Sequence, residues 1–150
     1  MKRLIVVIAL VLLAAGCSKS ATPGLPTTNT IAPLPFHGSP SRDELQRSAG
    51  ISFPESTSDY RSVRVDPAEL DVAFTLSEAD VDAFIAESHL PSLTDGRRLI
   101  VHASPVWEQN PTGVIRSTSS EAKGVMRTVE VVTYGSGSAT ARLSISTTPE

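Results

Sequence analysis

The chain has little that could cross-link or rigidify a small fold. Cys17 is the single cysteine in 150 residues, so no disulfide can form within one chain. Aromatic residues make up 5% of the sequence and include one tryptophan, Trp107. A core must therefore be built mainly from Val, Leu, Ile and Ala, and it must be stable without a covalent bridge.

Basic charge is also scarce. The sequence has 13 Lys and Arg residues against 16 Asp and Glu residues, and two of the basic residues, Lys2 and Arg3, lie at the start of the chain. After residue 16 there is no run of basic residues beyond the pair Arg97-Arg98. This composition argues against a nucleic-acid surface, which needs a basic stripe, and against binding to anionic lipid by charge.

Motifs of common catalytic sites are missing. No Gly-x-Ser-x-Gly elbow occurs, nor any Ser-x-x-Lys together with its companion motifs. The run Gly135-Ser136-Gly137-Ser138 is typical of a flexible turn and not of a phosphate cradle, because no lysine follows it. We therefore expect no catalytic residues and no cofactor.

The three histidines do not form a metal motif. They are His37, His89 and His102, and none belongs to a His-x-x-x-His or His-Glu-x-x-His pattern. A pair of His89 and His102 would be conceivable only if the end of a helix over 78–89 met a strand over 99–101. We expect no metal site and keep His89 and His102, with Trp107, as possible partner contacts.

Acidic residues crowd one short stretch, Glu78, Asp80 and Asp82. The glycine and the distal glutamate of a calcium loop are missing there. Negative charge is favourable at the start of a helix, so these residues indicate a helix N-terminus.

Trp107 is interpreted as a packing residue, which would become a partner anchor if it were exposed.

The first 17 residues form a recognisable pattern. Lys2 and Arg3 precede the apolar run Leu4 to Leu13, and Ala14-Ala15-Gly16 then leads to Cys17. The apolar run is shorter than the roughly 20 residues of a spanning helix and is typical of a secretory signal. Small residues that end on a cysteine resemble the lipobox of bacterial lipoproteins.

This resemblance implies cleavage between Gly16 and Cys17 and acylation of Cys17. It places the protein on the extracytoplasmic side of the cell membrane or the outer membrane, where lipid on Cys17 holds it. Ser18 stands where an aspartate signals inner-membrane retention in Gram-negative relatives, which favours the outer membrane if the host has one.

Three segments follow from composition. Residues 1–16 are the signal peptide, and residues 17–40, rich in Pro, Ser and Thr, are predicted to be a disordered tether. Residues 41–148 are predicted to form a single small domain.

Within that domain, a serine start and a glycine stop predict a short helix over 41–50. Strands are expected over 59–65 and 70–76, the second half-buried because its apolar residues alternate with polar ones. Helical spacing of apolar residues predicts the main helix over 78–89.

The region 91–124 gives a weak signal, with a possible short strand over 99–101 and a loop over 117–124. Residues 125–134 and 139–146 flank a glycine-rich turn and predict a hairpin. The predicted fold class is α+β, a small antiparallel sheet with one main helix packed on one face.

Three short motifs, Gly50 to Pro54, Ala73 to Leu76 and Asp80 to Ile85, resemble uncharacterised small lipoproteins, many of them actinobacterial. The resemblance implies no activity. The sequence favours a membrane-anchored, non-catalytic binding or interaction module. A lipid-anchored enzyme or accessory subunit remains an alternative, as does a folding, secretion or immunity factor for a specific partner protein.

Overall fold

The computed structural model describes residues 33–35 and 38–147. The predicted signal peptide, Gly16, Cys17, most of the predicted tether and His37 lie outside these residues. Within the described part of the chain, no helix has the length and apolarity needed to cross a membrane.

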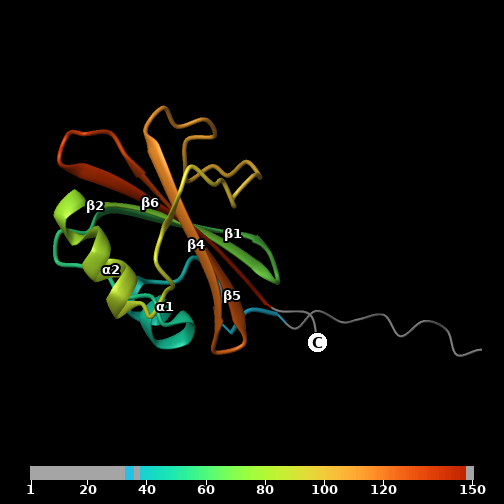
Figure 1. Ribbon diagram of the computed structural model, residues 1–150. Helices are drawn as coiled ribbons and strands as arrows, with labels where there is room; N and C mark the ends of the chain where they lie inside the picture. The colour runs from blue at the N-terminus through green and yellow to red at the C-terminus, as the bar shows by residue number, and fades with distance from the viewer. Residues whose placement is uncertain (1–32, 36–37, 148–150) are drawn as a thin grey trace, which may run out of the picture.

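One antiparallel sheet of six strands organises the described residues, with the order β1-β2-β6-β5-β4-β3 (Figure 1). The antiparallel sheet accompanied by helix confirms the predicted fold class in its coarse form. The strands are β1 (Ser58–Asp66), β2 (Glu69–Ser77), β3 (Thr94–Asp95), β4 (Val114–Ala122), β5 (Val125–Thr133) and β6 (Ser138–Thr147).

Both helices of the described residues are short, so the single main helix that the sequence predicted is not confirmed. They are α1 (Arg42–Ala49) and α2 (Val81–Glu87), and a 3-10 turn, η1 (Glu78–Asp80), precedes α2. The expected helix over 78–89 was wrong at both ends. Ser77 caps a tight 3-10 turn by accepting a hydrogen bond from the Ala79 amide, and His89 adopts a left-handed backbone, φ 51°, that ends the helix.

Local signals determine α1. The Ser41 hydroxyl accepts a hydrogen bond from the Glu44 amide at 3.3 Å, which satisfies one of the free N–H groups of the first turn. Gly50 follows the helix with φ 66°, a conformation that glycine adopts without the steric cost of a Cβ. The sequence predicted both caps, because Ser41 and Gly50 stand at the two ends of this stretch.

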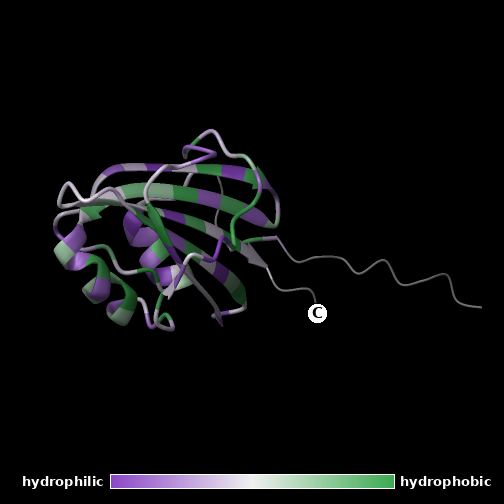
Figure 2. Ribbon diagram, turned by 45° about the horizontal axis from the view of Figure 1, so that its top comes forward, coloured by the Kyte–Doolittle hydropathy of each residue, from purple (hydrophilic) through white to green (hydrophobic). Residues whose placement is uncertain are grey.

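The main core lies between the sheet and the two helices, which lie on the same side of it (Figure 1). Phe74 of β2 packs edge-on against Phe84 of α2, with ring centroids 5.4 Å apart. The coloured bands of Figure 2 show apolar and polar residues alternating along the strands, and in a strand successive side chains point to opposite faces of the sheet. The sheet contributes Leu70, Val72, Phe74, Leu76, Val125, Val129, Val131, Ala139, Ala141, Leu143 and Ile145 to this core.

The opposite face of the sheet is covered by the irregular segment between β3 and β4, residues 96–113, which we call the cover loop. Its residues Ile100, Val106 and Trp107 pack against Ala73 of β2 in a second, smaller core. Strand β2 is therefore buried on both faces, so the predicted half-buried strand was wrong on this point. The predicted strand over 99–101 does not form, and the short strand β3 precedes that position instead.

The three C-terminal strands form two consecutive hairpins. The predicted hairpin is confirmed as β5 and β6, which pair from Val125↔Thr147 to Thr133↔Ala139. The predicted loop over 117–124 was wrong, because most of it belongs to β4. A two-residue turn, Lys123-Gly124, joins β4 to β5, and both residues have positive φ as a type I′ turn requires.

Parts of the predicted tether pack against the domain. Leu34 is buried and its amide donates to the Pro67 carbonyl at 2.9 Å. The Tyr60 hydroxyl donates to the Pro40 carbonyl at 2.6 Å, and Pro40 is also buried. The packed part of the chain therefore starts ahead of Ser41.

Candidate binding site beneath the cover loop

A buried ion pair lies on the loop-covered face of the sheet. Glu130 of β5 and Arg142 of β6 are direct cross-strand neighbours, both fully buried, with Oε2 and Nη2 3.6 Å apart. The other carboxylate oxygen of Glu130 accepts hydrogen bonds from the amides of Leu99 and Ile100, at 2.7 and 2.8 Å. Glu130 therefore attaches the first part of the cover loop to the sheet.

Arg142 has hydrogen-bonding capacity that its surroundings leave unused. Its guanidinium lies over the Trp107 ring, 5.4 Å from the centroid, in a cation-π contact. Among the described residues, no acceptor forms a hydrogen bond with its Nε, Nη1 or Nη2. Burial lowers the pKa of Arg142, and the charge of Glu130 opposes that shift. The pair is thus enclosed by the loop and serves to hold it.

A second polar cluster lies at the edge of the same face. Asp71 of β2 is fully buried, and both of its carboxylate oxygens lie 3.0 Å from Nε2 of His102 in the cover loop. Glu69, two residues earlier on β2 and therefore on the same face, places Oε1 3.8 Å from the same nitrogen. The side chains of His102 and Glu69 keep 35% and 30% of their surface exposed, so solvent reaches the cluster.

Neighbouring side chains hold the carboxylates in place. The Ser144 hydroxyl donates to Glu69 Oε1 at 2.9 Å, from the position directly opposite Asp71 in the β2–β6 register. Desolvation raises the pKa of Asp71, while hydrogen bonds from Ser104 and His102 oppose the shift. His102 also packs against Trp107, with ring centroids 5.4 Å apart. The cluster thus joins β2, β6 and the cover loop.

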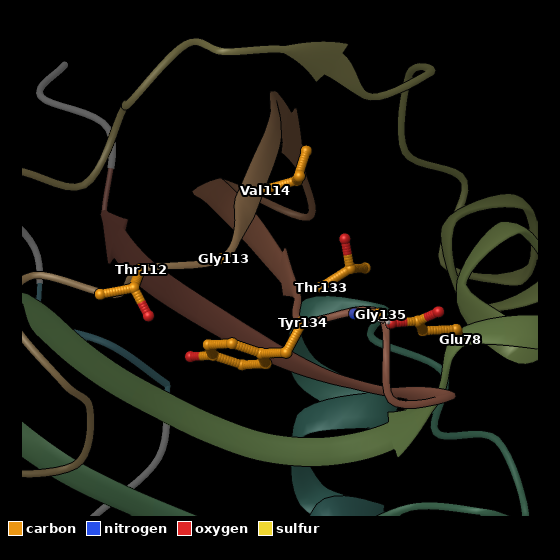
Figure 3. Close-up of a pocket in the computed structure, with 7 residues that line it drawn as sticks. All are labelled: Glu78, Thr112, Gly113, Val114, Thr133, Tyr134 and Gly135. Carbon is orange, nitrogen blue, oxygen red and sulfur yellow. Dashed lines mark hydrogen bonds between the residues drawn. The ribbon is translucent and has the colours of Figure 1, made fainter.

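Two pockets adjoin the cover loop. One of about 220 Å³ is lined by His102 and by the polar side chains of Arg98, Gln109 and Asn110. The other, of about 450 Å³, lies where β4 begins and β5 ends, and Figure 3 shows its walls. Glu78 stands at one side of it and accepts a hydrogen bond from the Gly135 amide at 3.2 Å. The second pocket has no cluster of ionisable groups comparable to the one at His102.

His89 and His102, the two histidines weighed as a metal pair, lie on opposite faces of the sheet. His89 follows α2 on the helix-covered face, where its carbonyl faces Arg127. His102 lies on the other face, beside Asp71. A metal pair of His89 and His102 is therefore not formed. Gly16 and Cys17 lie outside the described residues.

Trp107 has the packing role that the sequence favoured, since it is 6% exposed and belongs to the smaller core. It does not meet the condition of exposure that would have made it a partner anchor. The acidic residues Glu78 and Asp80 are used locally, by the Gly135 amide and the Ser56 hydroxyl.

Sequence reasoning missed Glu69 and Asp71. Their spacing of two residues on a strand was an available signal, because such residues share one face of a sheet. The signal was concealed because the strand was expected to begin at residue 70, which leaves Glu69 outside it, and because Asp71 belongs to the polar residues of that half-buried strand. Their partner His102 is 31 residues from Asp71 along the chain, and no local pattern connects the two.

No protein-family model matches the chain, and no curated protein or solved structure matches it either. The N-terminal sequence pattern and the geometry beneath the cover loop are therefore the features that point to a function.

Proposed function

We propose that this chain is a lipid-anchored protein of the cell envelope whose folded domain is a non-catalytic binding module. The observation that carries the proposal is the N-terminal pattern: Lys2 and Arg3, a ten-residue apolar run, small residues, and then Cys17 as the single cysteine. A secreted chain with one unmodified thiol would carry an oxidisable group without a structural use. Acylation of Cys17 gives that thiol a function.

Lipid on Cys17 would hold the protein on the extracytoplasmic side of a membrane. Each buried methylene contributes about 0.8 kcal/mol, and one acyl chain alone gives only marginal, reversible binding. Two or three chains would make the attachment permanent on a cellular timescale. The Pro-, Ser- and Thr-rich composition of residues 18–33 is typical of a spacer between anchor and domain.

The binding role is supported by how the polar groups of the domain are used. Glu130 and Arg142 are enclosed beneath the cover loop and hold it to the sheet. His102 and Glu69 converge with Asp71 at the loop's edge and remain reachable from solvent. A partly open cluster with fixed neighbours is suited to holding a ligand.

The anchor is tested by metabolic labelling with a radioactive fatty acid in cells that produce the full chain. The wild-type protein should incorporate label, and Cys17→Ser should lose it because no thiol remains to be acylated. Ser20→Ala is the matched control and should keep the label, since it changes a nearby residue and leaves Cys17 intact. Equal labelling of wild type and Cys17→Ser would contradict the proposal.

A further inference from the structure

We propose that Glu69, Asp71 and His102 form a site for one divalent transition-metal ion of the Zn²⁺ type. The inference deepens the proposed binding role by naming a ligand for it, and it rests on that role but not on the lipid anchor. One imidazole nitrogen and the oxygens of two carboxylates supply the donors, and these donor atoms all lie within 4.8 Å of one another.

The distances between donors fit an ion placed among them. Zn²⁺ bonds of about 2.0–2.2 Å in tetrahedral geometry place neighbouring donor atoms about 3.3–3.6 Å apart. The observed distances from His102 Nε2 are 3.0 Å to Asp71 and 3.8 Å to Glu69, which bracket that range. The third distance, between the carboxylate oxygens of Asp71 and Glu69, is at most 4.8 Å. The side chains of Glu69 and His102 are partly exposed and have room to move toward the ion.

Charge balance favours a cation at this place. Two carboxylates converge here, one of them fully buried, and among the described residues their ion-pair partner is His102 alone. The nearest buried cation on this face, Arg142, pairs with Glu130 instead. A divalent ion with two carboxylates and a neutral imidazole has no net charge, which is the arrangement that a partly buried position tolerates best.

The chemistry of the donors selects the class of ion. Ca²⁺ and Mg²⁺ prefer sets of oxygen ligands, whereas imidazole suits Zn²⁺ and the other first-row transition ions. Three protein ligands leave a further coordination position, and the exposed sides of His102 and Glu69 provide the path of entry.

Supporting contacts of the kind that metal sites need are already present. Ser144 donates to Glu69, Ser104 to Asp71, and Trp107 packs against the His102 ring. Because His102 belongs to the cover loop and the carboxylates to β2, the ion would fasten the loop to the sheet. Metal binding should therefore stabilise the folded protein as well as occupy the site.

The test is a titration of the full chain, purified from membranes in detergent and freed of metal with a chelator, with ZnCl₂ in a calorimeter. The wild-type chain should bind one Zn²⁺, and its unfolding temperature should rise when Zn²⁺ is added. His102→Asn should weaken binding at least 100-fold, because it removes a direct ligand. Ser144→Ala should weaken it about tenfold, the usual effect of losing a supporting contact to a ligand.

The matched control is His89→Asn, which removes the same type of side chain from the other face and keeps a residue that accepts a positive φ. It should leave Zn²⁺ affinity within about twofold of wild type, because His89 is remote from the proposed metal site. Cys17→Ser should also keep wild-type affinity. If Cys17 were not acylated, its free thiolate could itself bind Zn²⁺. Unchanged affinity in Cys17→Ser therefore shows that the ion binds elsewhere, whether or not the anchor exists.

Three results would overturn the proposal. One is absence of Zn²⁺ binding by the wild-type chain, and another is unchanged affinity in a folded His102→Asn chain. The third result applies if His102→Asn does not fold. Glu69→Gln, a change at a partly exposed residue, is then titrated in its place, and unchanged Zn²⁺ affinity in that variant would overturn the proposal.

Discussion

At the scale of single residues, Arg127 is a side chain that contacts the C-terminal ends of both helices. It is buried on the helix-covered face of β5, and Nη1 donates to the carbonyls of Ala49 and Gly50 at the end of α1. The same nitrogen donates to the Ser88 carbonyl at the end of α2, at 2.8 Å. One guanidinium thus satisfies carbonyls that a helix leaves unpaired and places positive charge at the C-terminal ends of two helix dipoles.

We predict that Arg127→Met lowers the free energy of unfolding by about 3 kcal/mol, because buried carbonyls of both helix ends lose a charged donor. Urea denaturation followed by circular dichroism measures the change. Arg61→Met, on the exposed edge strand β1, is the matched control and should stay within about 0.5 kcal/mol of wild type. Equal stabilities of the two variants would show that Arg127 does not hold the helices.

The position of Arg127 in the sequence and its charge point to opposite conclusions about burial. Arg127 lies two residues from Val125 and two from Val129 on β5, so it shares their face of the sheet. That row of positions is expected to be buried. The charge of Arg127 nevertheless suggests exposure, since arginine is seldom fully buried without partners. The partners are carbonyls more than 35 residues away, and their position depends on the tertiary fold.

At the scale of elements, the sequence predicts best the structures whose causes are local. Helix α1 has its serine cap and its glycine stop within the predicted stretch, and the β5–β6 hairpin has alternating residues around a glycine-rich turn. Strand β4 was missed because Ser117 to Ser120 have the composition of a loop. Their strand conformation comes from pairing with β5 and from burial of Ser117 and Thr118.

The turn before β5 carried a signal that went unused. Lys123-Gly124 separates two residues that pair directly, Ala122 and Val125. A glycine at the second position of a two-residue turn is typical of a type I′ hairpin. Recognition of that turn would have extended the predicted sheet back through residues 114–122.

Gly113 determines how β4 enters the sheet. A Cβ at this position would clash with the Thr133 carbonyl and would lie 2.8 Å from Val132 Cγ1, so the backbones of β4 and β5 would have to move apart. Gly113 also forms part of the pocket wall next to Thr133 and Tyr134 (Figure 3).

Gly113→Ala should therefore destabilise the fold by about 1–3 kcal/mol, the usual cost of forcing extra volume into a packed site. Thermal unfolding monitored by circular dichroism provides the measurement. The adjacent exposed substitution Thr112→Ala should have an effect below about 0.5 kcal/mol. A Gly113→Ala chain as stable as wild type would mean that the close approach of β4 to β5 is not needed.

At the scale of the whole molecule, the sheet lies between two unlike layers, helices on one face and the cover loop on the other (Figures 1 and 2). The sequence predicted the first layer, because amphipathic spacing reveals helices. It could not predict the second, since the cover loop has no periodicity and is held by Glu130, about 30 residues away. The cluster of Glu69, Asp71 and His102 depends on that loop and was missed for the same reason.

The proposed function combines a lipid anchor, inferred from the sequence, with a binding role for the domain built around this sheet. The proposed anchor would determine where the domain acts, and the functional proposal depends on it. It concerns Cys17, which lies outside the described residues, so it requires a measurement on the protein itself.

Intact-mass spectrometry of the protein purified from the membranes of its native cells is the most direct test. The account predicts a chain that begins at Cys17 and is heavier than its amino-acid sequence by the mass of two or three acyl chains with their linking glycerol. A chain that begins at Cys17 without added hydrocarbon, or one that retains residues 1–16, would contradict it.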